Sequence, residues 1–291
     1  MPAPFMPLLC GYRSGGNPNT SDNNDGLSKE LGQELFRIVG VPDGQRGPDD
    51  PGAALEQQVR AHLAELRPDL RTAISASAAS FEQYEHLAVF PRYRRGHQGA
   101  VLTLAPLIAA SRDLSSSIER EKFLRLLDAA SEAFQRQDDL AFELMEHMPQ
   151  EALLKIDVTI AEPQRDTLAR LQIALSSKWS LRTDRAQDCV SQGAKLVAQR
   201  RGRMPHFGVV TMEPRPSMLK ILGDGSGAVD CVYHLNLPAL EHAMSALAVR
   251  GRRHPETWSP MQTFRRLVQQ RRLRDYDALV SEVERLPVPS P

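Results

Sequence analysis

The sequence predicts an α/β fold in which helices flank a central mixed β-sheet. Helical periodicity dominates the first half of the chain, short apolar runs typical of strands follow, and helical periodicity returns at the end. We therefore expect one domain over residues 1–291, in which a helical first half (about 27–147) wraps onto a sheet core (about 152–235). Helices at about 237–286 close the chain.

The first half alternates loops with helices. Residues 11–26 are rich in Gly, Asn, Ser and Asp, and residues 40–52 are rich in Gly and Pro, so both are expected to be loops. Pro51 precedes the second helix closely, which suits a first helical turn. Helices are expected at 27–39, about 53–66, 76–89 and 118–147, the last with an apolar stripe of Phe123, Leu126, Leu127, Ala130 and Phe134.

The second half changes character at about residue 152. Short apolar runs there predict buried strands, and periodic segments predict helices. Strands are expected at 153–160, 168–175, 207–212 and 229–233. Helices are expected at 185–201, 237–248, 260–272 and 275–285.

Composition excludes several classes of protein. With 36 basic and 36 acidic residues the chain has no net charge, so it is not a nonspecific polycation, although a local basic face remains possible. No apolar run reaches the roughly 18 residues of a membrane span, so no membrane association is expected. The three cysteines are scattered, which favours reduced thiols in a cytosol over disulfides or a zinc site.

An aspartate and a lysine could meet at one end of the sheet. Asp157 lies in the first expected strand, and Lys178 ends the second, 21 residues later. An aspartate can bind a divalent metal that activates a phosphate, and a lysine can offset phosphate charge or help deprotonate water. This is the logic of the nuclease pattern PD-(D/E)xK, but Ile156 and Ser176 replace its proline and second acid. Taken alone, a strand-end aspartate and a surface lysine explain the pattern more often.

Three polar residues follow the lysine where a helix should begin. Arg182 and Arg185 could bind guanine O6 and N7, and Asp184 could accept from the cytosine amino group, so the set suits G·C pairs. The alternative is structural. Asp184 could be the N-cap of the helix, and Arg185 could form a surface ion pair.

The segment Ser-Lys-Trp-Ser-Leu-Arg-Thr-Asp-Arg-Ala-Gln at 177–187 resembles the NgoMIV-like type II restriction endonucleases, the CCGG-cutting group of the PD-(D/E)xK nuclease superfamily. The resemblance is strongest over 173–235, where it includes Glu213-Pro214 and the segment Asp230-Cys231-Val232-Tyr233-His234. It implies a restriction-endonuclease-like PD-(D/E)xK core with a central mixed β-sheet flanked by helices.

The resemblance also implies a catalytic site that uses Mg2+. Lys178 matches the catalytic lysine, and Asp157 is the best match for the metal-binding aspartate. The backbone carbonyl of Ser177 would be a metal ligand, and Glu56 would support the metal through water.

One position departs from the family pattern. Gln192 stands where the family has a catalytic glutamate on the helix after the lysine. Glutamine can hold a metal-bound water but adds no negative charge. Asp188, one turn earlier, could substitute for the missing acid.

The resemblance assigns base recognition to the same helix start. Arg182, Asp184 and Arg185 match the residues that recognise a CCGG core in the major groove. Met218 replaces the arginine that recognises the outer base pair, and Arg215 is close enough to serve instead. The implied site is GCCGGC.

The function implied is Mg2+-dependent hydrolysis of double-stranded DNA at this palindrome, leaving 5′ CCGG overhangs and 5′-phosphomonoesters, within a restriction-modification system of the bacterial cytoplasm. Homodimers would assemble into a homotetramer. Two alternatives stay open: a cleavage-impaired DNA-binding protein of the same fold, and a related nuclease with little sequence preference. A basic stretch could also hold phosphates, although it is more often a solvated helix face; it comprises Arg265, Arg266, Arg271, Arg272 and Arg274.

Overall fold

The computed structural model describes residues 2–89, 118–147, 154–224, 227–251 and 254–289. Its centre is a six-stranded sheet with the strand order β1-β2-β3-β4-β5-β6. β1, β2 and β3 are antiparallel neighbours, whereas β3 to β6 run parallel. The strands are β1 (Arg71–Ser77), β2 (Lys155–Glu162), β3 (Arg170–Lys178), β4 (His206–Thr211), β5 (Cys231–His234) and β6 (Leu273–Asp275).

Helices cover this sheet, so the expected mixed α/β architecture is confirmed. The helices before the sheet core are α1 (Met6–Leu9), α2 (Gly26–Ile38), α3 (Pro51–Leu66) and α5 (Ile118–His147). The later helices are α6 (Thr183–Gln199), α7 (Pro216–Gly223), α8 (Leu237–Arg250), α9 (Ser259–Gln269) and α10 (Tyr276–Glu284).

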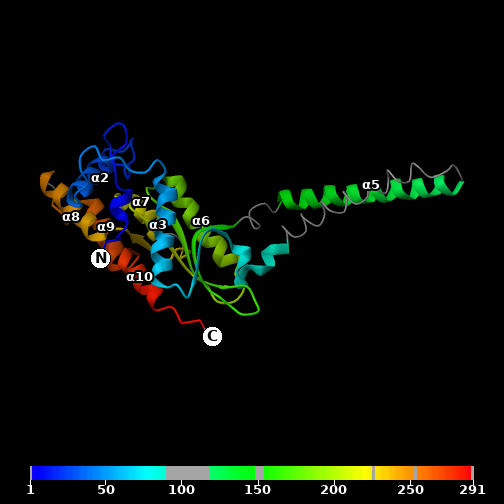
Figure 1. Ribbon diagram of the computed structural model, residues 1–291. Coiled ribbons are helices and arrows are strands. Elements are labelled where there is room, and N and C mark those ends of the chain that lie inside the picture. Colours follow the sequence, from blue (N-terminus) through cyan, green and yellow to red (C-terminus); the bar gives the residue numbers. More distant parts are fainter. Residues whose placement is uncertain (1, 90–117, 148–153, 225–226, 252–253, 290–291) are drawn as a thin grey trace.

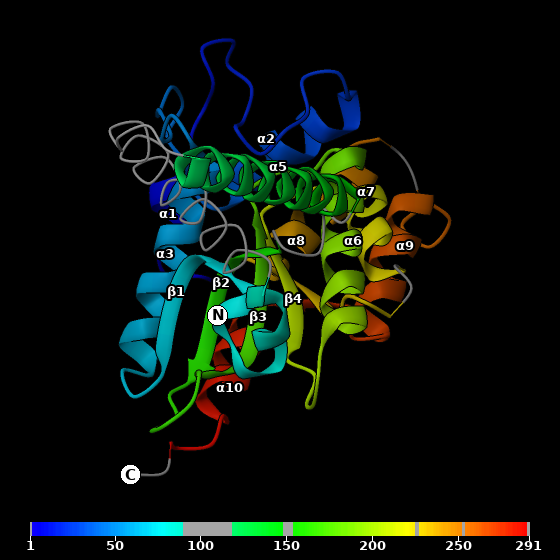
Figure 2. The same ribbon diagram turned by 90° about the vertical axis from the view of Figure 1, so that its right-hand side faces the viewer.

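Two helices bracket the strands that carry the candidate site. α3 packs against β1, β2 and β3, and α6 lies on the other side of the strands in Figure 2. α6 approaches β4 closely at Gly193, where an added Cβ would lie 2.7 Å from the Phe207 ring and 2.5 Å from the Ala228 carbonyl oxygen. A larger residue at this position would therefore push α6 away from the sheet.

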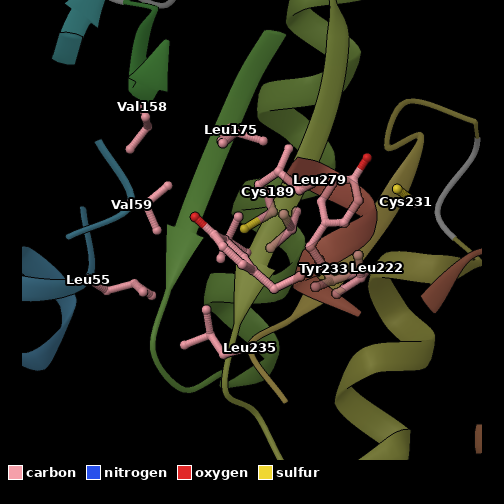
Figure 3. Packing of buried hydrophobic residues seen from close by; sticks show 14 of the residues in the cluster. Leu55, Val59, Val158, Leu175, Cys189, Leu222, Cys231, Tyr233, Leu235 and Leu279 are labelled. Carbon is pink, nitrogen blue, oxygen red and sulfur yellow. The ribbon is translucent and has the colours of Figure 1, made fainter. Parts of the chain in front are cut away.

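The core between these elements is continuous and apolar. Leu55 and Val59 of α3 point towards the strands that carry Val158 and Leu175 (Figure 3), and all four side chains are fully buried. Burying a leucine or valine side chain stabilises the fold by roughly 1.5–3 kcal/mol. The strands that carry the candidate site therefore pack against a well-filled apolar core.

The long helix α5 departs from the expected arrangement. It is helical as expected, but it extends away from the sheet (Figure 1), and its stripe residues Phe123 and Leu126 are 47% and 63% exposed. This part of the helical first half therefore does not wrap onto the sheet. Among the described residues, neither α5 nor any other helix combines the length and apolar character needed to cross a membrane.

The prediction of a helix at 76–89 is mainly wrong. Residues 76–89 were expected to be helical, but Arg71–Ser77 form the edge strand β1, and only short 3-10 turns follow at Ala78–Ser80 and Glu82–Ala88. The strand forms because Ala73 and Ala76 pair with Thr159 and Ile156 of β2. The short elements α7 and β6 were not expected.

Candidate active site

The adjacent strands β2 and β3 bring Asp157 and Lys178 into direct contact. The Lys178 Nζ atom donates to the Asp157 Oδ2 atom at 2.5 Å, so the expected proximity of these side chains is confirmed. The same oxygen accepts from the Ser176 hydroxyl at 3.1 Å and from the Ser177 backbone N–H at 2.8 Å. Among the described residues none donates to Oδ1, which leaves this oxygen available to a cation.

The contact lies in a groove between the strands and α6. The groove is lined by Leu154, Lys155, Asp157, Ser176, Lys178, Asp188, Cys189, Ser191, Gln192 and Lys195. The Gln192 amide nitrogen donates to the Lys155 carbonyl oxygen at 2.5 Å. Both Gln192 and Asp188, the two residues considered for the missing acid, therefore line the groove that contains Lys178.

Glu56 adds a second carboxyl group from α3. Burial, and then the negative charge of Asp157, raises the pKa of Glu56, while Lys178 opposes this shift. The carboxyl groups of Glu56 and Asp157 therefore repel each other. A divalent cation would relieve their repulsion.

The donor set fits a divalent cation that takes most of its ligands from outside the protein. No group of three His, Cys, Asp or Glu side chains suited to a metal ion occurs among the described residues. Mg2+ commonly uses one or two carboxylates and takes its other oxygens from water and phosphate. Asp157 and Glu56 can supply the carboxylates. The Ser177 hydroxyl is buried without a partner, so only the backbone of Ser177 is engaged at this site.

The start of α6 presents polar side chains to the surface. Arg182 occupies the N-cap position without a side-chain capping bond, and Asp184 lies inside the first turn, so the alternative that Asp184 is the N-cap is wrong. Arg182, Asp184 and Arg185 are all exposed. No side-chain hydrogen bond or ion pair joins any of the three to another residue in the described ranges. Three side chains able to bind base edges are therefore available to an external partner.

The two residues expected at the outer base pair lie in different surroundings. Arg215 is only 4% exposed, and its guanidinium group binds Glu213, Asp22, Asp25 and the Leu181 carbonyl oxygen. This arrangement does not favour contact with DNA. Met218 is half-buried and packs against the core.

The C-terminal basic stretch is largely engaged in internal bonds. Arg266 pairs with Asp224 at 3.1 Å, and Arg274 pairs with Glu282 at 3.0 Å. Arg272 donates to the Val229 carbonyl oxygen at 3.3 Å. These bonds favour a structural role over a free phosphate-binding surface.

The part of the chain that carries most of the candidate site is also the part that matches known proteins. Residues 151–283 match the family model described as NgoMIV restriction enzyme. This region is NgoMIV-like. The type II restriction enzyme NgoMIV of Neisseria gonorrhoeae is 47% identical to this chain over 77 residues, which are 26% of this chain and 27% of the relative.

The NgoMIV-like region contains most of the site. It includes β2, β3 and α6, and with them Asp157, Lys178 and the exposed start of α6. Glu56 of α3 lies outside it. The assigned roles of these residues remain predictions.

Sequence reasoning did not single out three charged residues near the site. Lys155 and Lys195 line the groove, and buried Glu213 binds the segment that follows Lys178. Two signals could have indicated the lysines. Lys155 lies two residues before Asp157 on a strand, and Lys195 lies three residues after Gln192 on a helix, so each shares a face with a candidate residue.

Proposed function

We propose that this protein is a type II restriction endonuclease that hydrolyses double-stranded DNA at a palindrome with a CCGG core. The observation that carries the proposal is one continuous segment of the NgoMIV-like region. It holds Lys178 against Asp157, and four residues later it begins the exposed set Arg182, Asp184 and Arg185.

The groove residues Asp157 and Lys178, with Ser177 and Glu56 beside them, support phosphodiester hydrolysis. Asp157, the Ser177 carbonyl and, through water, Glu56 would hold Mg2+, which would polarise the scissile phosphate and activate a water. Lys178, held by Asp157, would place a positive charge where negative charge accumulates on the phosphate oxygens. Water attacks phosphorus and the bond to the 3′ oxygen breaks, which gives a 5′-phosphomonoester and a 3′ hydroxyl.

The start of α6 supports recognition of the core sequence. Arg182 and Arg185 would bind guanines bidentately, and Asp184 would accept from a cytosine amino group. GCCGGC is the extended site that we propose, with 5′ CCGG overhangs. Because Met218 has no hydrogen-bond donor to offer, the outer pair requires another residue.

The symmetry of a palindromic site matches that of a protein with a twofold axis. We therefore propose a homodimer that assembles into a homotetramer, to be tested by analytical ultracentrifugation with and without DNA. The enzyme would act in the bacterial cytoplasm beside a methyltransferase that protects host DNA.

A second candidate function is a DNA-binding protein that has lost cleavage. Gln192 and Ser176 favour it, because neither supplies the negative charge that the nuclease pattern has at those positions. A nuclease with little sequence preference is the third candidate.

Plasmid digestion separates the three candidates. The protein is incubated with plasmid of known sequence with Mg2+, with Ca2+ or with EDTA. Discrete fragments in Mg2+ alone support the restriction enzyme, a retarded intact band supports the binding protein, and a smear supports the nonspecific nuclease.

The variant K178A tests the catalytic assignment. It should lose at least about 100-fold in cleavage rate, the scale of a positioned charged or proton-transferring group, while it still retards the plasmid. K220A is the matched control, because Lys220 lies on α7 outside the groove. Normal cleavage by K178A would remove Lys178 from the active site.

A further inference from the structure

We infer that the ion pair of Glu213 and Arg215 is a positioning device that fixes the segment between Lys178 and Arg182, and so couples cleavage to base recognition. This inference rests on the proposed function. It concerns Glu213 and Arg215, which are buried and do not line the groove that contains Lys178.

The pair binds both polar groups of one peptide residue. The Glu213 Oε2 atom accepts from the Leu181 backbone N–H at 2.7 Å. The Arg215 Nη2 atom donates to the Leu181 carbonyl oxygen at 2.5 Å. Leu181 directly precedes Arg182, so these two bonds determine where the base-recognition residues begin.

The ion pair of Glu213 and Arg215 is buried and is held by hydrogen bonds on both residues. Glu213 is 0% and Arg215 is 4% exposed, and the Arg215 Nε atom donates to the Glu213 Oε1 atom at 2.6 Å. The Glu213 backbone N–H donates to the Thr211 hydroxyl at 3.1 Å, which ties the pair to the end of β4. Buried ion pairs add little stability over apolar residues of similar size, so a geometric role explains this one better.

The far side of Arg215 connects to the N-terminal loop. Its Nη1 atom donates to the Asp22 carboxylate at 3.2 Å and to the Asp25 carboxylate at 3.3 Å. Asp25 also caps α2 by accepting from the Ser28 backbone N–H at 3.1 Å. Arg215 therefore holds the recognition segment and α2 in a fixed relation.

The loop before α2 also binds the segment between Lys178 and Arg182 at Trp179, the residue that follows the catalytic lysine. The Trp179 indole N–H donates to the Asn19 side-chain oxygen at 3.0 Å, and the Met212 backbone N–H donates to the Trp179 carbonyl oxygen at 3.2 Å. Trp179 and Leu181 are thus both fixed, one on each side of Ser180. This leaves little freedom between the catalytic lysine and the first base-recognition residue.

Such bonds matter because catalysis depends on small displacements. A shift of about 1 Å at a catalytic group can reduce a rate by about 100-fold. If Leu181 is released, Arg182 and Lys178 can move independently, and a correct base contact no longer aligns the scissile phosphate. The expected result is a larger loss of rate at the true site than at altered sites.

The experiment compares R215K and R215A with R266A and the wild type. R266A is the matched control because it loses an exposed ion pair with Asp224, away from the segment. Initial cleavage rates are measured on a duplex with the site that the wild type cuts and on duplexes with one changed core base pair. Circular dichroism establishes that each protein is folded at the assay temperature.

For the wild type and R266A we expect the same ratio of cognate to altered-site cleavage. For folded R215K and R215A we expect this ratio to fall by about 10-fold or more, with R215K less affected. An unchanged ratio in the folded variants overturns the inference. Loss of the fold in both variants at every assay temperature also overturns it, because the pair would then serve stability alone. Failure of the wild type to cut at discrete sites would instead refute the proposed function.

Discussion

The Lys178 ammonium lies 2.5 Å from the Asp157 carboxylate across the β2–β3 pair. Because one oxygen of Asp157 receives this ammonium, the Ser176 hydroxyl and the Ser177 N–H, its orientation is set before any ligand arrives. The carboxylate and the ammonium of the proposed site are therefore preorganised, which lowers the reorganisation needed during reaction.

Restoring an acid at position 192 should strengthen metal binding. Q192E adds a carboxylate to the groove that contains Asp157 and Lys178, so we expect cleavage to reach half its maximum at a lower Mg2+ concentration. Cleavage rates across a Mg2+ titration measure the effect. D188N is the companion variant: a raised Mg2+ requirement would identify Asp188 as the substitute acid, whereas no change would exclude it.

Removing Arg182 should weaken discrimination between DNA sequences. A bidentate arginine–guanine contact contributes about 1–3 kcal/mol of discrimination, so R182A should bind CCGG duplexes and duplexes with a changed G·C pair more equally. Competition binding in Ca2+ measures this directly. R285A, which changes an exposed arginine after α10, should behave like the wild type. Unaltered selectivity in R182A would exclude it from base recognition.

Glu56 should impose a pH dependence on cleavage. Burial and Asp157 raise its pKa, so it takes up a proton at a higher pH than an ordinary glutamate as the solution is acidified. The wild-type cleavage rate should therefore fall as the pH is lowered below neutrality. The E56Q variant should cleave DNA more slowly at neutral pH, and its cleavage rate should not show this fall at acidic pH. If the wild type and E56Q show the same dependence of cleavage rate on pH, the titrating group is not Glu56.

His206 should make the fold more stable at neutral than at alkaline pH. Burial alone would lower its pKa, but hydrogen bonds with Asp230 and Cys231 outweigh burial and raise the pKa to about 9. Because this value exceeds the ordinary 6.5, the stabilisation is fully present below about pH 6.5 and is lost as the pH rises through about 9. Urea unfolding of the wild type and H206Q at pH 6 and pH 9.5 should show a difference in unfolding free energy that shrinks by about 3 kcal/mol at the higher pH. A constant difference would contradict the assignment.

The sequence predicted the elements that have a clear apolar period. Residues 26–38 form α2, and its leucines at 31 and 35 are buried as the period requires. The edge strand β1 was missed because it is made of small and polar residues and several of its side chains are exposed. β6 was missed because three residues carry too little pattern, and its position depends on pairing with β5.

The candidate site was predictable where it is local in sequence. Lys178 and the arginines of the α6 start fall within eight residues, so their spacing alone indicated a common role. Asp157 required only the assumption of neighbouring strands, which β2 and β3 satisfy. The pairing of Arg215 with Asp22 was beyond prediction, because 193 residues separate them and nothing in the local pattern marks either as a partner.

That contact between two distant parts of the chain has a consequence during synthesis. A ribosome makes Asp22 early and Arg215 only after more than two thirds of the polypeptide has been assembled. Until then Asp22 and Asp25 lack the guanidinium group that binds them, and Leu181 lacks its two hydrogen-bond partners. We therefore expect a nascent chain that ends before Arg215 to lack a fixed geometry between Lys178 and Arg182 and, with it, the proposed cleavage activity.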